Sequence, residues 1–392
     1  MKNKNQIAII GGAGHIGAPL GINLSYAGYQ SILIDINKNN INLINKGKMP
    51  FIEQGAEKIL KKLLKKKKIF ASSKLDLVKN CKYIIVCIGT PVNSKNIPLK
   101  KDFVNFFKKL KKYLNQDHIV IIRSSVYPGI LDEIYKILKT KCSNLSYCPE
   151  RIAQGYSLIE QKKMAQIISG FNKRSITESS KIFRKISGKI ILSKINEAEM
   201  IKLFSNAYRY SHFSISNLFY MMCVQKNLDF SKIRNLMMTQ YNRNISLPNS
   251  GFVSGPCLYK DTMQLSHYFE NKFKIINNIK NINEKLPNFI LKKLCKKYTL
   301  KKKTIGVLGV AFKPENDDIR DSLPMKLVKI LKRKKINVIY SDDYYRGKDT
   351  CEKKDLIRNS DIIIIGTAHK SYRKLKFKKK QIIIDIGGIF EK

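Results

Sequence analysis

The sequence contains no apolar run that approaches the length of a membrane span, so we expect no membrane-spanning segment. Its first residues, MKNKNQIAIIGGAGHIG, carry basic side chains followed by a short apolar run. Glycines interrupt that run and lead into a helical pattern, which predicts a first β-strand and not a signal peptide.

The eight cysteines show no CxxC spacing. This absence argues against a zinc site and against a disulfide framework. Several of the cysteines lie in apolar runs and are interpreted as small core residues. We therefore expect no metal site and a reducing, cytoplasmic location.

Acidic residues are scarce, because 29 Asp and Glu accompany 75 Lys and Arg and the formal net charge is +46. Such a balance would attract nucleic acids or anionic membranes. The lysines are scattered through almost every segment, however, and no nucleic-acid recognition motif accompanies them. The densest block, KKLLKKKK at residues 61–68, is interpreted as the solvated face of an amphipathic helix. We expect no nucleic-acid or membrane partner, although the charge would help to draw in a polyanionic substrate.

The chain has 392 residues, 43% of them hydrophobic, which is enough for two or three domains with sizeable cores. Short apolar runs alternate with helical patterns, and this order predicts an α/β fold with mostly parallel sheets. The first set of strands is expected at residues 6–10, 31–36, 83–88, 119–122, 145–147 and 167–169. A second α/β unit opens with a strand at Thr304, and its later strands are expected at residues 337–340, 361–366 and 382–386.

A dinucleotide-binding fingerprint follows the first strand. The residues GAGHIG at 12–17 have the G-x-G-x-x-G spacing, and Asp35 ends the second strand eighteen residues after the last glycine. The glycines allow a pyrophosphate to approach backbone N–H groups at a helix N-terminus. Asp35 would accept hydrogen bonds from the ribose and repel a 2′-phosphate, which favours NAD over NADP. The expected cofactor contacts are Gly12, Gly14, His15, Ile16, Gly17 and Asp35, with His15 interpreted as a residue that only opens the helix.

Polar residues follow three further strands. Thr90-Pro91, Ser124-Ser125 and the PER segment at residues 149–151 each lie just past the C-terminal end of an expected strand. Ligands bind at that edge of an open α/β sheet, so these segments are candidate binding loops.

A long helix is expected from Asn196, with Glu199 three residues on as in a capping box. It is apolar on several faces and therefore needs partners on more than one side, which suggests a central helix and a dimer element. Lys202 and Asn206 lie four residues apart and share one helix face. On these residues alone, ordinary surface polarity is the favoured interpretation. His212 and His267 lack ligand spacing and are interpreted as structural. A Lys- and Asn-rich linker is expected at residues 271–285, before a helix at 286–297.

The stretch LPNSGFVSGPCLYKD, residues 247–261, places a cysteine in a loop rich in glycine and proline. Gly251, Gly255 and Pro256 shape a turn that brings backbone close to a ligand. A thiol beside cations such as Lys260 is a candidate nucleophile, because the thiolate is the reactive form. A loop cysteine without function is the alternative on these residues alone.

A second charged loop, AFKPENDDIRDS at residues 311–322, follows the strand that begins at Thr304. It contains Lys313 and Arg320 beside a strand end, where they would suit phosphate or uracil contacts. A solvated charged loop is the alternative.

Five blocks of sequence, in order and over nearly the whole chain, resemble the nucleotide-sugar dehydrogenases of the UDP-glucose/GDP-mannose dehydrogenase type. The blocks are GGAGHIG; CIGTPVN with RSSVYPG; CPERIAQG; EAEMIKLFSNAYR; and GFVSGPCLYKD followed by GVAFKPENDDIRDS. The segment GKMPFIEQG, residues 47–55, also resembles the family's substrate-facing loop. The combination is far more specific than any single block.

The resemblance implies two Rossmann-like, doubly wound parallel sheets joined by a helical core with a long central helix. Its three parts would be an NAD-binding domain at residues 1–194, a helical dimerisation domain at 195–298 and a UDP-sugar-binding domain at 299–392. It also implies a homodimer and a four-electron oxidation, in which two NAD+ convert the C6 alcohol of a UDP-sugar to a carboxylate.

The same resemblance implies a role for each matching residue. Cys257 would be the thiol nucleophile that forms a thiohemiacetal and then a thioester. Lys202 and Asn206 would stabilise the oxyanion, and Glu150 and Asp261 would order the water that hydrolyses the thioester.

Further matches complete the implied site. Ser125 stands where the family has a threonine and keeps the hydroxyl that holds the water. Arg243 would contact substrate, either within one subunit or across a dimer. The remaining expected cofactor contacts are Thr90, Pro91, Ser125, Lys260 and Arg320. The expected substrate contacts are Glu150, Arg151, Lys202, Asn206, Arg243, Gly251 and Lys313.

Substrate choice is indicated by the PER segment, which stands in place of the PEF of UDP-glucose enzymes and resembles members that act on UDP-N-acetylhexosamines. The GPCLYKD segment departs from the GGSC or GGHC form of other branches. We therefore expect a UDP-sugar, with an N-acetylhexosamine ahead of glucose.

Two alternatives remain at this point. A two-electron β-hydroxyacid dehydrogenase shares the first domain and a helical second domain, but it needs neither the cysteine nor the strands after Thr304. A non-catalytic basic protein that binds nucleic acid or acts as a scaffold would use the charge alone.

Overall fold

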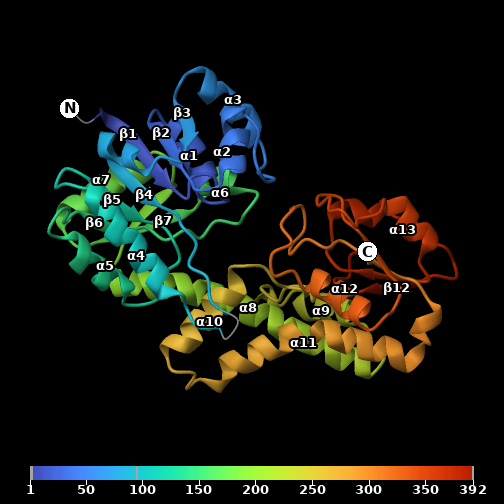
Figure 1. Cartoon of the computed structure of the whole chain (residues 1–392). Helices are drawn as coiled ribbons and strands as arrows, with labels where there is room; N and C mark the ends of the chain where they lie inside the picture. The colour runs from blue at the N-terminus through green and yellow to red at the C-terminus, as the bar shows by residue number, and fades with distance from the viewer. Residues whose placement is uncertain (1–2, 94–95, 391–392) are drawn as a thin grey trace. The chain divides into compact units, whose positions relative to one another are not determined.

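The computed structural model describes residues 3–93 and 96–390, and the chain divides into two compact units, residues 1–204 and 205–392 (Figure 1). Each unit is an α/β structure built on its own sheet. The predicted α/β class with two parallel sheets is confirmed. In the described part of the chain, no helix combines the length and the apolar character needed to cross a lipid bilayer.

The first unit contains an eight-stranded sheet of order β3-β2-β1-β4-β5-β6-β7-β8, in which only the β6–β7 pair is antiparallel. Its strands are β1 Asn3–Ile10, β2 Gln30–Ile34, β3 Ile69–Ser72, β4 Cys81–Val86, β5 Ile119–Ile122, β6 Leu145–Tyr147, β7 Ala165–Gly170 and β8 Lys189–Leu192. Its helices are α1 Gly17–Tyr26, α2 Lys38–Asn45, α3 Ala56–Lys65, α4 Lys100–Leu110, α5 Ile130–Leu138, α6 Ser157–Lys163 and α7 Lys173–Arg184, with 3₁₀ turns η1 Leu75–Asn80 and η2 Lys111–Tyr113. The order of the first six strands is that of a doubly wound dinucleotide-binding sheet.

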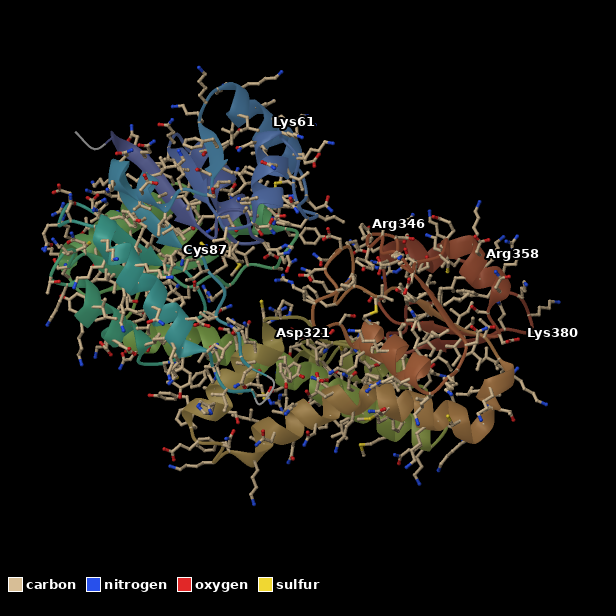
Figure 2. All side chains as sticks on the ribbon, in the orientation of Figure 1. Lys61, Cys87, Asp321, Arg346, Arg358 and Lys380 are labelled. Carbon is tan, nitrogen blue, oxygen red and sulfur yellow. The ribbon has the colours of Figure 1, made fainter. Side chains whose placement is uncertain are left out.

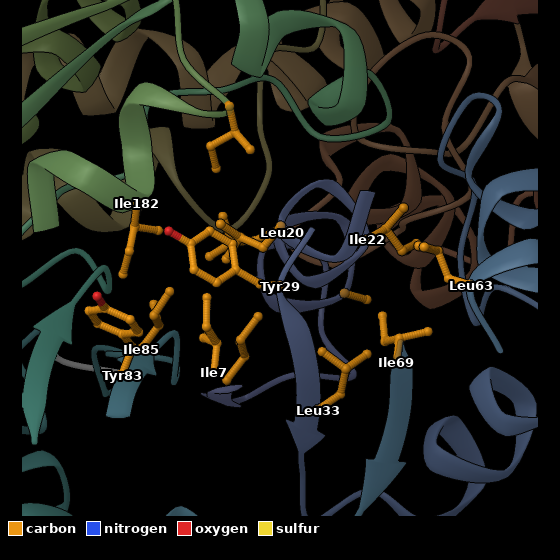
Figure 3. Close-up of a cluster of buried hydrophobic side chains, with 14 of the residues drawn as sticks. Ile7, Leu20, Ile22, Tyr29, Leu33, Leu63, Ile69, Tyr83, Ile85 and Ile182 are labelled. Atoms are coloured by element: carbon orange, nitrogen blue, oxygen red, sulfur yellow. The ribbon is translucent and has the colours of Figure 1, made fainter. Parts of the chain in front are cut away.

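Both faces of this sheet are buried, except along the edge strand β8, which is mostly exposed. Side chains alternate along β1, so that Ile7 and Ile9 join one apolar cluster while Ala8 and Ile10 join another. Helices α1, α3 and α7 contribute to the first cluster, and α4 and α5 contribute to the second. Figure 3 shows part of the first cluster, with Ile7 of the sheet among side chains of the surrounding helices. Burial on both faces explains why the strands are nearly continuous apolar runs.

The second unit contains a parallel four-stranded sheet of order β10-β9-β11-β12. Its strands are β9 Ile305–Leu308, β10 Val338–Ser341, β11 Ile362–Ile365 and β12 Ile382–Asp385. The helices from here on are α8 Ile195–Gln225, α9 Phe230–Met238, α10 Leu258–Tyr268, α11 Lys274–Lys297, α12 Leu323–Arg333 and α13 Lys353–Asn359. Three 3₁₀ turns accompany them: η3 Asn242–Asn244, η4 Leu300–Lys302 and η5 Lys370–Lys374. Helix α8 begins in the first unit and continues into the second.

The predicted start of α8 was wrong. The helix begins at Ile195, and the backbone N–H of Lys194 donates to the carboxylate of Glu197 at 2.9 Å. Glu199 does not close a capping box with Asn196, because its carboxylate accepts the N–H of Gly129 instead, at 2.9 Å. Glu199 therefore forms a contact with a distant segment of the chain and does not cap the helix.

The predicted linker at residues 271–285 was also wrong, since α11 runs through it from Lys274 to Lys297. The segment is rich in Lys and Asn, but it also contains an apolar series that predicts a helix: Ile275, Ile279, Ile282 and Leu286. Spacings of four, three and four residues place these side chains on one helix face.

A buried carboxylate joins the loops of the second sheet. Asp342 follows β10, and its two oxygens accept four backbone N–H groups, those of Val310, Ala311, Tyr344 and Tyr345, at 2.6–3.1 Å. The N–H of Glu315 donates to Nδ1 of His369 at 2.9 Å, which places the ring proton on Nε2, 3.2 Å from Asp342. Burial alone would raise the pKa of Asp342, but the hydrogen bonds from His369 and the backbone hold it below its ordinary value.

We predict that Asp342→Asn lowers the free energy of unfolding by about 1–3 kcal/mol at neutral pH, because buried N–H groups lose their charged acceptor. The lowered pKa means that the carboxylate stabilises the fold above about pH 4 and ceases to do so as the pH falls through the folded-state value. Urea unfolding at several pH values should therefore show the gap between wild type and variant closing below about pH 4.

The matched control is Asp349→Asn, whose side chain is 60% exposed and pairs with Lys332 at 3.1 Å. It should change stability by less than about 0.5 kcal/mol. Equal stabilities of Asp342→Asn and Asp349→Asn at pH 7 would contradict the prediction.

Candidate active site

The glycine loop between β1 and α1 is shaped by two close backbone contacts. A Cβ on Gly12 would lie 2.5 Å from the carbonyl oxygen of Ile9, and one on Gly17 would lie 2.3 Å from that of Gly11. A Cβ on Gly14 would meet only one neighbour, at 3.4 Å. Packing therefore requires the first and last glycines, while the middle one leaves room for a ligand to approach the backbone.

Asp35 lies directly after β2 and beside this loop. One carboxylate oxygen accepts the N–H of Ala13 at 2.9 Å, and the other accepts that of Asn37 at 3.0 Å. Each oxygen can accept a second hydrogen bond, so the position suits the hydroxyls of a ribose. The N-terminus of α1 next to it supplies the partial positive charge that a pyrophosphate requires. The loop and Asp35 thus fit a dinucleotide.

Two further loops of the first unit meet at His15. Its Nδ1 lies 2.8 Å from Nε2 of Gln154, and its ring centroid lies 4.0 Å from that of Phe51. Glu53 fixes the loop of Phe51 by accepting the N–H of Gly155 at 3.1 Å. His15 therefore does more than open the helix, because it joins the glycine loop to the segments at residues 47–55 and 150–156.

Glu150 lies in a buried ion pair that the sequence did not indicate. It contacts Arg123, whose side chain is fully buried, while that of Glu150 is 11% exposed. Three further N–H groups of Arg123, on Nη1 and Nη2, donate to the Cys148 carbonyl and to the side-chain oxygens of Gln161 and Gln166, at 2.8–3.1 Å. The second oxygen of Glu150 accepts the N–H groups of the two following residues at 2.8 and 3.0 Å. Both oxygens are therefore held in place.

Arg151, the neighbour of Glu150, donates from Nη2 to the carbonyl oxygen of Ala165 at 2.6 Å, at the start of β7. A guanidinium carries five N–H groups, so this contact orients the side chain and leaves capacity for a substrate.

The loop after β5 carries Ser125 and has contacts on two sides. The hydroxyl of Thr90 donates to the backbone carbonyl of Ser125. On the other side, Glu199 of α8 accepts the N–H of Gly129, and one turn further on the same helix carries Lys202. Burial raises the pKa of Glu199 to about 7, although the backbone N–H groups it accepts act in the opposite direction. Lys202 is itself buried.

Cys257 is exposed and occupies the N-terminal cap position of α10 in the second unit. One turn on, Asp261 is completely buried, and its N–H donates to the Cys257 carbonyl at 2.9 Å. Nδ2 of Asn206, on α8, donates to Asp261 at 2.5 Å, and Nζ of Lys260 lies 3.2 Å from the other carboxylate oxygen. Four of the predicted site residues of this unit thus form one cluster.

The cysteine loop packs against the loop that follows β9. Gly255 has a φ of +101°, and a Cβ on it would lie 2.4 Å from the Phe312 ring. Arg320 forms a two-point ion pair with Asp318, in which Nε donates to Oδ1 at 3.0 Å and Nη2 donates to Oδ2 at 2.6 Å. The pKa of Arg320 is raised, chiefly by these hydrogen bonds.

Three further predicted site residues are Lys313, Pro91 and Arg243. Lys313 lies in the same loop, 5.9 Å from the Phe312 ring centroid. Pro91 is exposed in the loop after β4, and Arg243 is exposed on η3. Of all the expected site residues, those up to Lys202 belong to the first unit and those from Asn206 on belong to the second.

The basic side chains are not concentrated on one helix, strand or loop. Figure 2 shows Lys61 on the first unit and Arg346, Arg358 and Lys380 on the second, each pointing outward from a different segment. This scatter fits a solvated surface better than a nucleic-acid-binding face. In the part of the chain that the structure describes, no group of three or more His, Cys, Asp or Glu side chains could hold a metal ion.

Three family models match the chain in sequence order. They are the NAD binding, central and UDP binding domains of the UDP-glucose/GDP-mannose dehydrogenase family, at residues 5–187, 196–285 and 306–392. The chain belongs to this family. It is an NAD-dependent oxidoreductase of nucleotide sugars, and the expected reaction is the four-electron oxidation characteristic of the family. The UDP binding domain accounts for the second sheet, which a two-electron β-hydroxyacid dehydrogenase would not need.

The relatives are similar over almost their full length. A UDP-N-acetyl-D-mannosamine dehydrogenase of Pyrococcus horikoshii is 28% identical over 98% of this chain and 96% of its own. The solved structure of a UDP-D-ManNAc dehydrogenase from the same organism has a TM-score of 0.88 at 26% identity and covers 98% of this chain and 96% of its own. A UDP-glucose 6-dehydrogenase of Rickettsia felis is 26% identical over 97% of this chain and 92% of its own.

We predict that Arg123→Gln destabilises the enzyme by about 3–5 kcal/mol, because it leaves the Glu150 carboxylate buried without its cation. Urea unfolding would measure the change. The control is Arg346→Gln, which breaks a pair whose side chains are 63% and 69% exposed and should cost less than about 1 kcal/mol. Similar losses in the two variants would contradict the prediction.

A second prediction concerns Glu199, whose folded-state pKa of about 7 lies above its value in the unfolded chain. The folded state therefore binds the proton more tightly, and wild-type stability should fall as the pH rises from about 4 through about 7. Glu199→Gln removes this loss, so the variant should be more stable than wild type at pH 8, by on the order of 1–3 kcal/mol.

The difference between Glu199→Gln and wild type should disappear near pH 4, in urea unfolding at a series of pH values. Glu197→Gln, at an exposed position in the first turn of the same helix, keeps an acceptor for the Lys194 N–H and should change stability by less than about 1 kcal/mol at every pH. A Glu199→Gln curve parallel to wild type would show that this carboxyl titrates normally.

Proposed function

We propose that the enzyme oxidises C6 of a UDP-N-acetylhexosamine to the carboxylate, with Cys257 as the nucleophile. The observation that carries this proposal is the cluster at the start of α10, where an exposed thiol is followed one turn later by a buried carboxylate that holds the Asn206 amide. An exposed thiol can reach a substrate carbon, and a fixed amide can stabilise the oxygen on that carbon.

The cofactor would be held by the glycine loop and Asp35, with Thr90, Pro91, Ser125, Lys260 and Arg320 as further contacts. NAD+ accepts one hydride in each of the two oxidations when it is bound. The carboxylate of Asp35 disfavours a 2′-phosphate by charge repulsion, so NAD is preferred over NADP.

The chain's own residues would act at the substrate in four steps. In the first, the C6 hydroxyl loses its proton and the carbon loses a hydride, which yields an aldehyde. The sulfur of Cys257 then forms a bond to that carbon, while the oxyanion is stabilised by Lys202 and Asn206. Loss of a second hydride produces a thioester. Water ordered by Glu150, Asp261 and Ser125 cleaves the carbon–sulfur bond, and the proton returns to sulfur.

The fixed geometry of Asn206 favours its role in this scheme. Its Nδ2 carries two hydrogens, and the one donated to Asp261 fixes the orientation of the other. A preorganised donor needs no rearrangement when charge develops on the substrate oxygen, which is why such donors contribute strongly to catalysis.

Substrate identity rests on the PER segment and on the relatives. Arg151 would contact the sugar together with Glu150, Gly251, Lys313 and Arg243. Because relatives over the full chain are UDP-N-acetyl-D-mannosamine dehydrogenases, we place a UDP-N-acetylhexosamine of manno configuration ahead of UDP-glucose.

We also propose that the enzyme is a homodimer formed by its helical part, residues 195–298, between an NAD-binding part at 1–194 and a UDP-sugar-binding part at 299–392. Four side chains of α8, those of Tyr208, Ile215, Leu218 and Met222, are 62%, 42%, 37% and 55% exposed. Spacings of seven, three and four residues place them on one face, and a second copy would cover it. All eight cysteines are free thiols, which fits the proposed cytoplasmic location.

The test is the number of NADH formed per sugar, with product mass, for a panel of nucleotide sugars. We expect two NADH and a uronic acid from a UDP-N-acetylhexosamine. Cys257→Ser should stop net turnover and accumulate an aldehyde-level adduct, while Cys295→Ser, at another exposed cysteine, should behave as wild type. One NADH per sugar in the wild type, or wild-type rates in Cys257→Ser, would refute the thioester route.

A further inference from the structure

The cysteine loop is held to α8 by a side chain outside the proposed catalytic set. Asn217 of α8 is completely buried, and it binds both backbone groups of Gly251. Its Oδ1 accepts the Gly251 N–H at 2.8 Å, and its Nδ2 donates to the Gly251 carbonyl at 3.0 Å. A carboxamide that takes both groups of one residue fixes the orientation as well as the position of that residue.

Asn217 lies on the same face of α8 as Asn206. The two are eleven residues apart, which corresponds to about 1,100° of rotation and differs from three full turns by about 20°. Their separation along the helix axis is about 16 Å. Asn206 binds Asp261 and Asn217 binds Gly251, so one helix face holds both ends of the segment that contains Cys257.

The distance between these two contacts determines the shape of the segment. Gly251 and Asp261 are ten positions apart, and an extended chain of that length would span about 33–36 Å. The two contacts lie about half of that distance apart along α8, and residues 258–261 form the first turn of α10, so the segment is not extended and Cys257 lies between its two contacts. Moving either end would move the thiol relative to the Asn206 amide.

The Asn217 amide is itself fixed by a buried network. Its Nδ2 also donates to Oδ1 of Asn283 on α11 at 2.7 Å, and Nδ2 of Asn283 donates to Ser214 at 2.7 Å. Asn217 and Asn283 are both completely buried. An amide flip would break bonds to Gly251 and Asn283 at once, which is costly in a buried site.

Other contacts of the loop have different partners or positions. Ser216 of α8 donates to the Pro248 carbonyl at 2.8 Å, and Arg234 of α9 donates to the Leu247 carbonyl at 2.6 Å, both before Gly251. After Gly251, the hydroxyl of Ser254 accepts the N–H of Leu323, which belongs to the C-terminal sheet region. Asn217 therefore supplies the contact that ties the loop, close to Cys257, to the helix of Asn206.

We propose that Asn217 is a positioning residue, which fixes the cysteine segment on α8 so that the Cys257 sulfur and the Asn206 amide face the same substrate carbon. Its catalytic consequence rests on the proposed function, whereas the anchoring itself does not. Loss of Asn217 should impair the second oxidation more than the first, because only the second requires sulfur to bond to the aldehyde carbon.

The experiment compares Asn217→Ala with Asn283→Ala. Each variant removes one buried carboxamide from the same network, but only the first removes the contact with Gly251. Hydrogen–deuterium exchange of a peptide covering residues 249–256 should be at least about tenfold faster in Asn217→Ala, because the Gly251 N–H loses its buried acceptor and the loop around it loses its anchor. In Asn283→Ala, exchange should stay within about threefold of wild type. With substrate and an aldehyde trap, NADH per sugar should fall from two toward one only in Asn217→Ala.

Two results would overturn the proposal. One is equal exchange of the loop in the two alanine variants, and the other is faster exchange in Asn217→Ala with two NADH per sugar retained. If Asn217→Ala does not fold, Asn217→Asp takes its place. It keeps an acceptor for the Gly251 N–H but turns a carboxylate oxygen toward the Gly251 carbonyl oxygen, so the loop should again exchange faster and NADH per sugar should again fall toward one. A wild type that forms no NADH with any nucleotide sugar would refute the proposed function, while the exchange data would still decide whether Asn217 holds the loop.

Discussion

The hydrogen bond between Asn206 and Asp261 is the contact on which the cysteine cluster depends. Asp261 is completely buried, and a buried carboxylate requires donors or cations around it. Asn206 of α8 and Lys260 supply them, and the Asp261 N–H in turn binds the Cys257 carbonyl. The polar face of α8 therefore determines where α10 begins and where its first residue presents the thiol. Changes to this face would alter the chemistry without touching sulfur.

The two sheets use one structural device for different purposes. In the first sheet, Asp35 follows β2 and accepts an N–H group of the loop after the neighbouring strand β1. In the second sheet, Asp342 follows β10 and accepts N–H groups of the loop after the neighbouring strand β9. Asp35 is only half-buried and accepts two N–H groups, so its oxygens retain capacity for a ligand. Asp342 is buried among four N–H groups and His369, which leaves little capacity for a ribose. Nucleotide contacts in the second unit are therefore expected from other side chains, such as Lys313 and Arg320.

Local patterns in the sequence were sufficient to predict those parts of the structure that depend on residues close together in the chain. The expected strands at residues 119–122 and 145–147 match β5 and β6, and the glycine loop lies where its spacing predicts. Contacts distant in sequence could not be foreseen. The partner of Glu150 lies 27 residues away, and Glu199 left its expected capping box for Gly129, 70 residues away. Arg123 stands next to Ser124-Ser125 at a strand end, which was the one signal that could have indicated it.

The scarcity of acids helps to distinguish the residues that the fold requires. Among the described residues, seven acids are buried: Glu53, Glu150, Glu178, Glu199, Asp261, Asp318 and Asp342. Six of them accept hydrogen bonds from backbone N–H groups or from side chains that are held in place by the fold. The seventh, Glu178, binds two lysines and a tyrosine. Lysine has no acceptor and cannot replace a carboxylate in such a contact, whereas it can replace most residues on a solvated surface. A chain rich in lysine can therefore keep its fold and its site, provided that the substitutions stay outside these positions.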